Sequence, residues 1–213
     1  MKIQFLNGGL ANQVFQYIFA RYYELSHPGE IMYLDDSYFA LNTVHNGYEL
    51  KSVFGLTPHM LSECFDEEVW NFILEERKSG KSIPTILCEN DIPFTMVAEE
   101  GDSSREFNPF SGQIMYVPCN EYHPDILDLD GDIYYHGYWI NKNWFAKYQD
   151  IFLKELFIGK WYRLFLMLTS TGNGTCLFFP TIQPGVGSIR KRWDSTPLTR
   201  SRILREMFRV RIT

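Results

Sequence analysis

A pair of adjacent glycines near the N-terminus, between an apolar run and an amphipathic stretch, most constrains the fold. Ile3–Leu6 predicts a short buried strand, and Gly8-Gly9 predicts a tight turn, because residues without a Cβ turn sharply. Apolar residues recur at helical spacing over Gln13–Leu25, which predicts an amphipathic helix with Asn12 as its N-cap. Glu30–Leu34 predicts the next strand. This βαβ order predicts an α/β fold with a parallel sheet.

Weaker patterns continue the α/β arrangement to about residue 156. They predict a turn-rich stretch at Asn46–Pro58, a helix at Glu67–Lys78 capped by Asp66, a strand at Ser82–Cys88, mostly loop at Glu99–Pro124, a strand at Ile133–Tyr135, and a helix that begins in Trp144–Leu156.

The glycine turn has the physical properties of an anion site. A helix start presents backbone N–H groups without intrahelical partners and a partial positive charge, and glycines allow a ligand to come close. A phosphate is held there without a lysine. Asn12 either caps the helix or directs its amide toward such a ligand. The spacing matches no Walker loop and no Gly-x-Gly-x-x-Gly motif, so taken alone the pair also fits an ordinary turn.

The residues around this turn resemble a known motif. Residues 8–17 read Gly-Gly-Leu-Ala-Asn-Gln-Val-Phe-Gln-Tyr, and glycosyltransferase family 11, the bacterial α-1,2-fucosyltransferases, opens with Gly-Gly-Leu-Gly-Asn-Gln-Met-Phe-Gln-Tyr. Ala11 and Val14 are the departures. Tyr48–Leu56, and Tyr135–Trp139 followed by Trp144-Phe145, resemble later blocks of that family in the same order. The resemblance covers about residues 1–156.

The resemblance implies the Rossmann-like N-terminal domain of a GT-B enzyme. The implied reaction is inverting transfer of L-fucose from GDP-fucose to the 2-hydroxyl of a terminal galactose, with no obligatory metal or other cofactor. It places Gly8, Gly9, Asn12 and Gln13 beside the donor phosphates. The implied partners are a nucleotide sugar and a galactose-terminated glycan of the cell surface.

Three further groups are candidates for the acceptor side of such a site. Asp35 and Asp36 end a predicted strand at the edge where α/β sheets bind ligands, so either is a candidate base, although an Asx turn also explains them. His136 is a candidate acceptor contact or catalytic group, and the alternative is a structural histidine. Aromatic rings either stack on a sugar or belong to the core. The aromatic candidates are Tyr138, Trp139 and Trp144.

The C-terminal segment departs from this pattern. Residues 1–153 carry a net charge of −14, and residues 154–213 carry a net charge of +8. The family's donor-binding signature, His-x-Arg-Arg-x-Asp-Tyr, is missing, because no histidine follows His136. We interpret the partial similarity of Ser188–Asp194 to this signature as coincidence. We interpret 157–213 as an atypical basic tail, either frameshifted or disordered, with a truncated and diverged C-terminal arm as the rival. The expected activity of this chain is therefore weak or absent.

Two alternative functions remain open on the sequence. One is an inactive fragment that at most binds acceptor glycan. The other is a metal-dependent glycosyltransferase in which Asp128 and Asp130 hold a divalent cation, although an acidic turn explains them as well. The basic tail lacks the periodic Lys/Arg faces of a nucleic-acid or lipid-binding arm, so neither partner is expected beyond peripheral membrane contact.

Composition predicts a chain that remains in the cytoplasm, at most peripheral at the inner membrane. The apolar start of the chain is too short for a signal peptide, and the longest later apolar stretch is too short for a membrane span. The four cysteines form no Cys-x-x-Cys pair, which argues against a zinc site or disulfide framework.

Overall fold

The fold is described from a computed structural model for residues 1–42, 46–101 and 112–156. The predictions that concern residues 157–213, namely the frameshifted or disordered tail and the coincidental similarity at Ser188–Asp194, lie outside the described residues.

The centre of the fold is a five-stranded sheet in which every pairing is parallel. Its spatial order is β2-β1-β5-β3-β4, so the first strand lies between the second and the last. This confirms the predicted α/β class and is consistent with a Rossmann-like fold. The strands are β1 Lys2–Phe5, β2 Met32–Asp35, β3 Thr95–Glu99, β4 Gln113–Val117 and β5 Ile133–His136.

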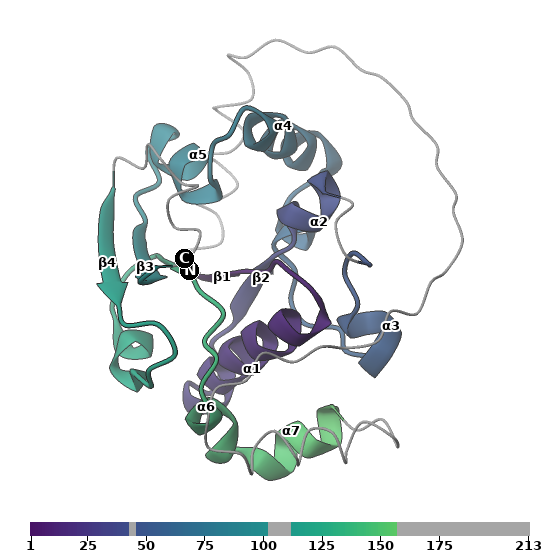
Figure 1. Ribbon diagram of the computed structural model, residues 1–213. Coiled ribbons are helices and arrows are strands. Elements are labelled where there is room, and N and C mark those ends of the chain that lie inside the picture. The colour runs from purple at the N-terminus through teal and green to yellow at the C-terminus, as the bar shows by residue number, and fades with distance from the viewer. Residues whose placement is uncertain (43–45, 102–111, 157–213) are drawn as a thin grey trace.

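Helices cover both faces of this sheet, as Figure 1 shows. One face carries α1 with α6 and α7, and the other carries α2, α4 and α5. This three-layer arrangement is required because a parallel sheet exposes two apolar faces. The helices are α1 Leu10–Ser26, α2 Ser37–Leu41, α3 Leu50–Phe54, α4 Glu67–Lys78, α5 Ile83–Glu89, α6 Lys142–Ala146 and α7 Gln149–Glu155, with 3-10 turns η1 Leu61–Cys64 and η3 Pro124–Asp128.

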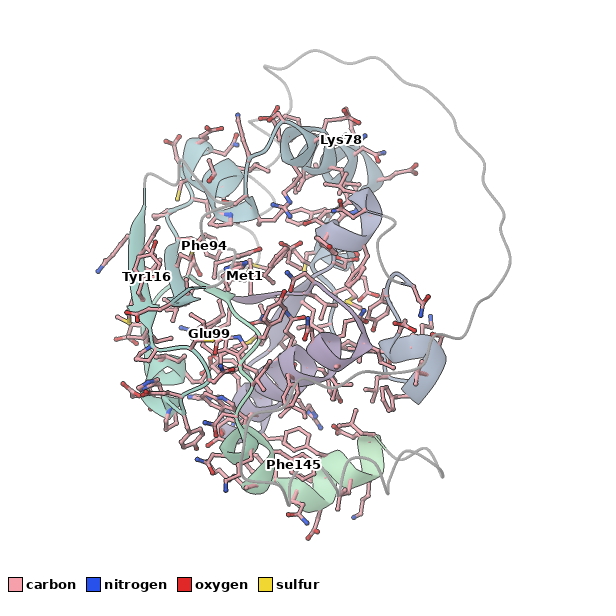
Figure 2. All side chains as sticks on the ribbon, in the orientation of Figure 1. Met1, Lys78, Phe94, Glu99, Tyr116 and Phe145 are labelled. Atoms are coloured by element: carbon pink, nitrogen blue, oxygen red, sulfur yellow. The ribbon has the colours of Figure 1, made fainter. Side chains whose placement is uncertain are left out.

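Successive side chains along each strand point to opposite faces of the sheet, and this divides the interior into two cores. Ile3 and Phe5 of β1 face α4 and α5, whereas Tyr135 of β5 packs with Phe19 of α1 on the opposite face. Figure 2 shows Phe145 of α6 next to α7, where its ring stacks on that of Phe152. The α1 core is the more aromatic, and it surrounds the loop that follows β5.

The predicted N-cap of α1 is wrong. The helix begins at Leu10, its N-cap is Gly9, and Asn12 lies inside the first turn. Gly8 has a φ of +76°, which is costly for residues with a Cβ, and it delivers Gly9 in an extended conformation. The two glycines therefore complete the reversal before Asn12 is reached.

The strand predicted at Ser82–Cys88 is also wrong, because this segment is the helix α5. Ser82 caps it by accepting a hydrogen bond from the Thr85 N–H at 3.2 Å, and Pro84 occupies the first turn, where no amide donor is needed. By contrast, Asp66 does cap α4, accepting from the Val69 N–H at 2.9 Å as predicted.

The stretch predicted as mostly loop, Glu99–Pro124, contains the edge strand β4. β4 pairs with β3, a strand that the sequence analysis also did not predict, and together they extend the sheet beyond β5. Val117 of β4 packs into the core beneath α1 and Ile114 against the core beneath α4 and α5, whereas Tyr116 remains 51% exposed (Figure 2). The predicted strands are confirmed within a few residues for β1, β2 and β5. The helix predicted to begin in Trp144–Leu156 is also confirmed.

Candidate functional site

The strands of a parallel sheet all end at one edge, and here that edge gathers most of the predicted site residues. β1 leads into Gly8-Gly9, β2 into Asp35-Asp36 and β5 into Gly137-Tyr138. From β1 the chain crosses to β2 on one side and later returns as β5 on the other. Ligands of open α/β sheets bind at such a point, outside the carboxyl ends of the strands.

The glycine turn leaves the start of α1 without a side-chain cap. The first helical hydrogen bond runs from the Gln13 N–H to the Gly9 carbonyl at 3.1 Å, so the preceding first-turn amides have no intrahelical acceptor. Gly9 and Asn12 are half-buried, and within the described ranges the Asn12 side chain makes no hydrogen bond. The φ of Gly8 favours glycine there, and a Cβ would lie 2.5 Å from Asn12 Nδ2, so that side chain would have to move aside.

Gln13, predicted as a donor contact, is fully buried and holds the turn from inside. Its Nε2 donates to the carbonyls of Gly8 at 3.0 Å and Gly47 at 2.9 Å, and its Oε1 accepts from the Glu49 N–H at 2.9 Å. These bonds occupy the amide on both sides. Gln13 therefore fixes the glycine turn to the 47–49 segment. A ligand at this turn would contact the half-buried Gly9 and Asn12 instead.

Two further glutamines connect the glycine turn to the loop after β5. Gln16 accepts from the Asn7 N–H at 3.1 Å and donates to Asn7 Oδ1 at 2.6 Å and to the Gly137 carbonyl at 3.4 Å. Gln4 donates to the same carbonyl at 3.1 Å. The ends of β1 and β5 are therefore joined by buried amides, which makes this part of the edge rigid.

Glu99, at the end of β3, is a buried carboxylate that the sequence analysis missed. Its Oε2 accepts from the N–H groups of Tyr138 at 2.7 Å and Trp139 at 3.0 Å, and its Oε1 accepts from that of Asn120 at 3.1 Å. Figure 2 labels Glu99 at this end of the sheet. The available signal was an acidic residue directly after a short apolar run, but β3 itself had not been predicted.

The three aromatic acceptor candidates do not share one surface. Trp139 and Trp144 are each 1% exposed and pack on Phe19, with ring centroids 4.3 Å and 5.0 Å away. Both indoles therefore belong to the α1 core, where they do not reach a sugar in solution. Tyr138 is half-buried and lies at the carboxyl edge, so it is the remaining aromatic candidate.

The acidic candidates differ in what their carboxylates already bind. Asp35 is fully buried and accepts from the Tyr134 hydroxyl at 2.6 Å and the Ser37 N–H at 2.9 Å. Asp36 is half-buried and accepts from the Ser62 hydroxyl and N–H at 2.6 Å and 3.1 Å. Burial raises the pKa of Asp36 above its ordinary value, and the bonds from Ser62 oppose that rise.

His136 lies in the opposite core from the indoles, 1% exposed and with its ring 5.1 Å from that of Phe5. Burial, followed by the nearby Arg77 charge, lowers the pKa of His136 to about 3. The imidazole is therefore neutral near pH 7, and its burial separates it from any acceptor in solution.

We expect His136 to make stability fall on acidification. A buried neutral histidine binds no proton between its folded pKa of about 3 and its unfolded value of 6.5, whereas the unfolded chain does. The free energy of unfolding should thus drop by about 2 kcal/mol between pH 7.5 and pH 5 through this group. Denaturant titrations of the protein and of His136→Gln at both pH values measure it. An equal pH dependence in the two proteins would contradict the assignment.

The Asp-x-Asp pair lies at the other end of the sheet, before the start of β5. Asp128 Oδ1 is 3.0 Å from His27 Nε2, and nearby Asp132 pairs with the N-terminal amine of Met1. Across residues 1–42, 46–101 and 112–156, no three His, Cys, Asp or Glu side chains gather in a way that suits a metal ion. Asp128 and Asp130 are thus separated from the glycine turn by the length of the strands.

Comparison with protein-family models, with curated proteins and with solved structures finds no match. In the part of the chain that is described, none of the helices combines the length and apolar character needed to cross a bilayer.

Proposed function

We propose that this chain is a member by descent of the inverting GT-B glycosyltransferases, related to those that transfer L-fucose from GDP-fucose to the 2-hydroxyl of a terminal galactose. The observation that carries the proposal is the uncapped start of α1 after Gly8-Gly9, at the carboxyl edge of a parallel sheet. A diphosphate fits such a site because its charge is met by free amides and the helix dipole.

The roles of the candidates follow from their exposure. The amides after Gly8 and the half-buried Asn12 face the donor phosphates, and Gln13 and Gln16 keep the turn in place. In an inverting transfer, charge develops on the leaving diphosphate while the acceptor hydroxyl loses a proton. Asp36 is the best-suited base among the three candidates, because Asp35 and His136 are almost completely buried.

The proposed donor site predicts a selective effect of Asn12. Replacing Asn12 by alanine should weaken GDP binding about five- to tenfold, because one amide contact to the ligand is lost while no described hydrogen bond within the protein is broken. Isothermal titration with GDP measures this, and guanosine should bind more weakly because it lacks phosphates. Asn71→Ala, an exposed asparagine on α4, is the matched control and should leave binding unchanged.

Separate titrations with GDP and with a galactoside decide between the enzyme and its rival. The rival is an inactive fragment that at most binds acceptor glycan, and it is favoured by the missing donor-binding signature. Binding of a galactoside without binding of GDP would support the fragment and contradict the donor site. Because a GT-B cleft needs two walls for positioning and charge stabilisation, we expect weak or no turnover of GDP-fucose. Rapid turnover would contradict that expectation.

A further inference from the structure

A cavity of about 290 Å³ lies on α1 far from the glycine turn. It is enclosed by the second half of α1, the loop 55–59 after α3, Met32 at the start of β2, and Glu155 at the end of α7. α1 extends over about 25 Å, and the cavity residues begin at Tyr17, so this space is separate from the proposed donor site. Its volume is near the lower limit for small-molecule pockets.

The polar wall of the cavity presents donors and acceptors side by side. Arg21 Nε donates to Glu155 Oε1 at 3.0 Å and Nη1 donates to Glu24 Oε2 at 3.1 Å, while the Tyr17 hydroxyl donates to Glu155 Oε2 at 2.8 Å. These three charged side chains keep between 18% and 32% of their exposure, so their remaining lone pairs and N–H groups are accessible. Ala20, Met32, Leu56 and Pro58 add apolar surface, and Gly55, Thr57 and the exposed His59 complete the lining.

The charge balance of this wall excludes most small ligands. Arg21 is neutralised by two carboxylates, and the surplus negative charge opposes a phosphate or a carboxylate. An ammonium group would find acceptors in Glu24 and Glu155, but the adjacent Arg21 guanidinium carries the same charge and opposes it. A hydroxyl both donates and accepts, so neighbouring hydroxyls on a ring match a wall of alternating donors and acceptors, and the carbon face of such a ring matches the apolar side.

We propose that this cavity binds a neutral, polyhydroxylated ring, as a free monosaccharide or as the last residue of a glycan. Glu24 Oε1 and the uncommitted Arg21 N–H groups hold adjacent hydroxyls, and the Met32 side of the cavity packs against the carbon face. The site is independent of the proposed donor site.

Saturation-transfer NMR on the full chain with methyl β-glucoside, methyl α-mannoside and methyl β-galactoside tests this site. At least one glycoside should bind saturably, and Glu24→Gln should weaken it about tenfold, because a charge-assisted hydrogen bond becomes a neutral one. Thr57→Trp, at an exposed position on the rim, should block binding, whereas Glu68→Gln on α4 should have no effect. GDP binding should be the same in all three variants, which separates this site from the proposed donor site.

The same experiment contains the outcomes that overturn the proposal. Binding by none of the glycosides, or glycoside binding that survives both Glu24→Gln and Thr57→Trp, shows that the cavity is not a sugar site. Saturable, Glu24-dependent binding of ethanolamine or glycine with no glycoside binding assigns it to an amine instead. A disaccharide that binds more tightly than its methyl glycoside identifies a glycan end as the source, and equal binding identifies the free sugar.

Discussion

Replacing Trp139 by alanine is expected to lower the free energy of unfolding by about 4 kcal/mol. The indole is 1% exposed, it stacks on Phe19 at 4.3 Å with an interplanar angle of 11°, and its Nε1 donates to Gln4 Oε1 at 2.7 Å. Alanine removes this ring from the α1 core and leaves a buried amide oxygen with one donor fewer. Equilibrium unfolding in urea, followed by far-UV circular dichroism, measures the loss.

Two further variants identify the source of the Trp139 effect. Trp139→Phe keeps a ring on Phe19 but loses the bond to Gln4, so it should cost about 2 kcal/mol. Trp70→Ala removes a half-buried indole that stacks on Phe65 at the larger distance of 6.0 Å, and its loss should be clearly smaller. If Trp139→Ala were no more damaging than Trp70→Ala, the central place of Trp139 in the core would be wrong.

Replacing Glu99 by alanine should cost about 3 kcal/mol, because three backbone N–H groups lose their buried acceptor. Two of these groups hold the loop after β5, including Trp139 at a φ of +56°, which is uncommon for a bulky side chain. The matched control is Glu100→Ala. That side chain is exposed and its backbone bond to Val117 is retained, so the change should remain within about 0.5 kcal/mol.

A double-mutant cycle of Glu99 and Gly137 tests whether the Glu99 side chain occupies the space beside Gly137. A Cβ at Gly137 would lie 2.7 Å from Glu99 Oε2, so Gly137→Ala should destabilise the protein by about 2 kcal/mol. In the Glu99→Ala background that space is empty, and the same change should cost much less. Additive losses in the double mutant would show that Glu99 does not occupy the space beside Gly137.

Local patterns in the sequence were sufficient for the first βαβ unit. Ile3–Leu6, the glycine pair and the periodic helix after it carry signals within a few residues of each other, and these elements are confirmed. The Asp66 cap is equally local, because a cap and its N–H partner are three residues apart. The α/β class followed from the order of these elements alone.

Non-local pairing decided the rest of the fold. β4 is an edge strand that pairs with β3, and the apolar runs of the two strands, Met96–Ala98 and Ile114–Val117, are too short to be assigned to strands from the pattern alone. Ser82–Cys88 is too short for its apolar residues to distinguish a helix from a strand, and the Ser82 cap with Pro84 in the first turn settles it as a helix.

For the candidate site, the sequence by itself determined the residue types that gather at one sheet edge: the glycine turn, the acidic pair after β2 and the aromatic block after β5. Only the tertiary structure decided which of them face solvent. Gln13, His136, Trp139 and Trp144 are buried, whereas Asn12, Asp36 and Tyr138 are not. The physical reason is that burial depends on which helix covers each face of the sheet, and that follows from contacts between residues such as Phe19 and Trp139, which are far apart in the chain.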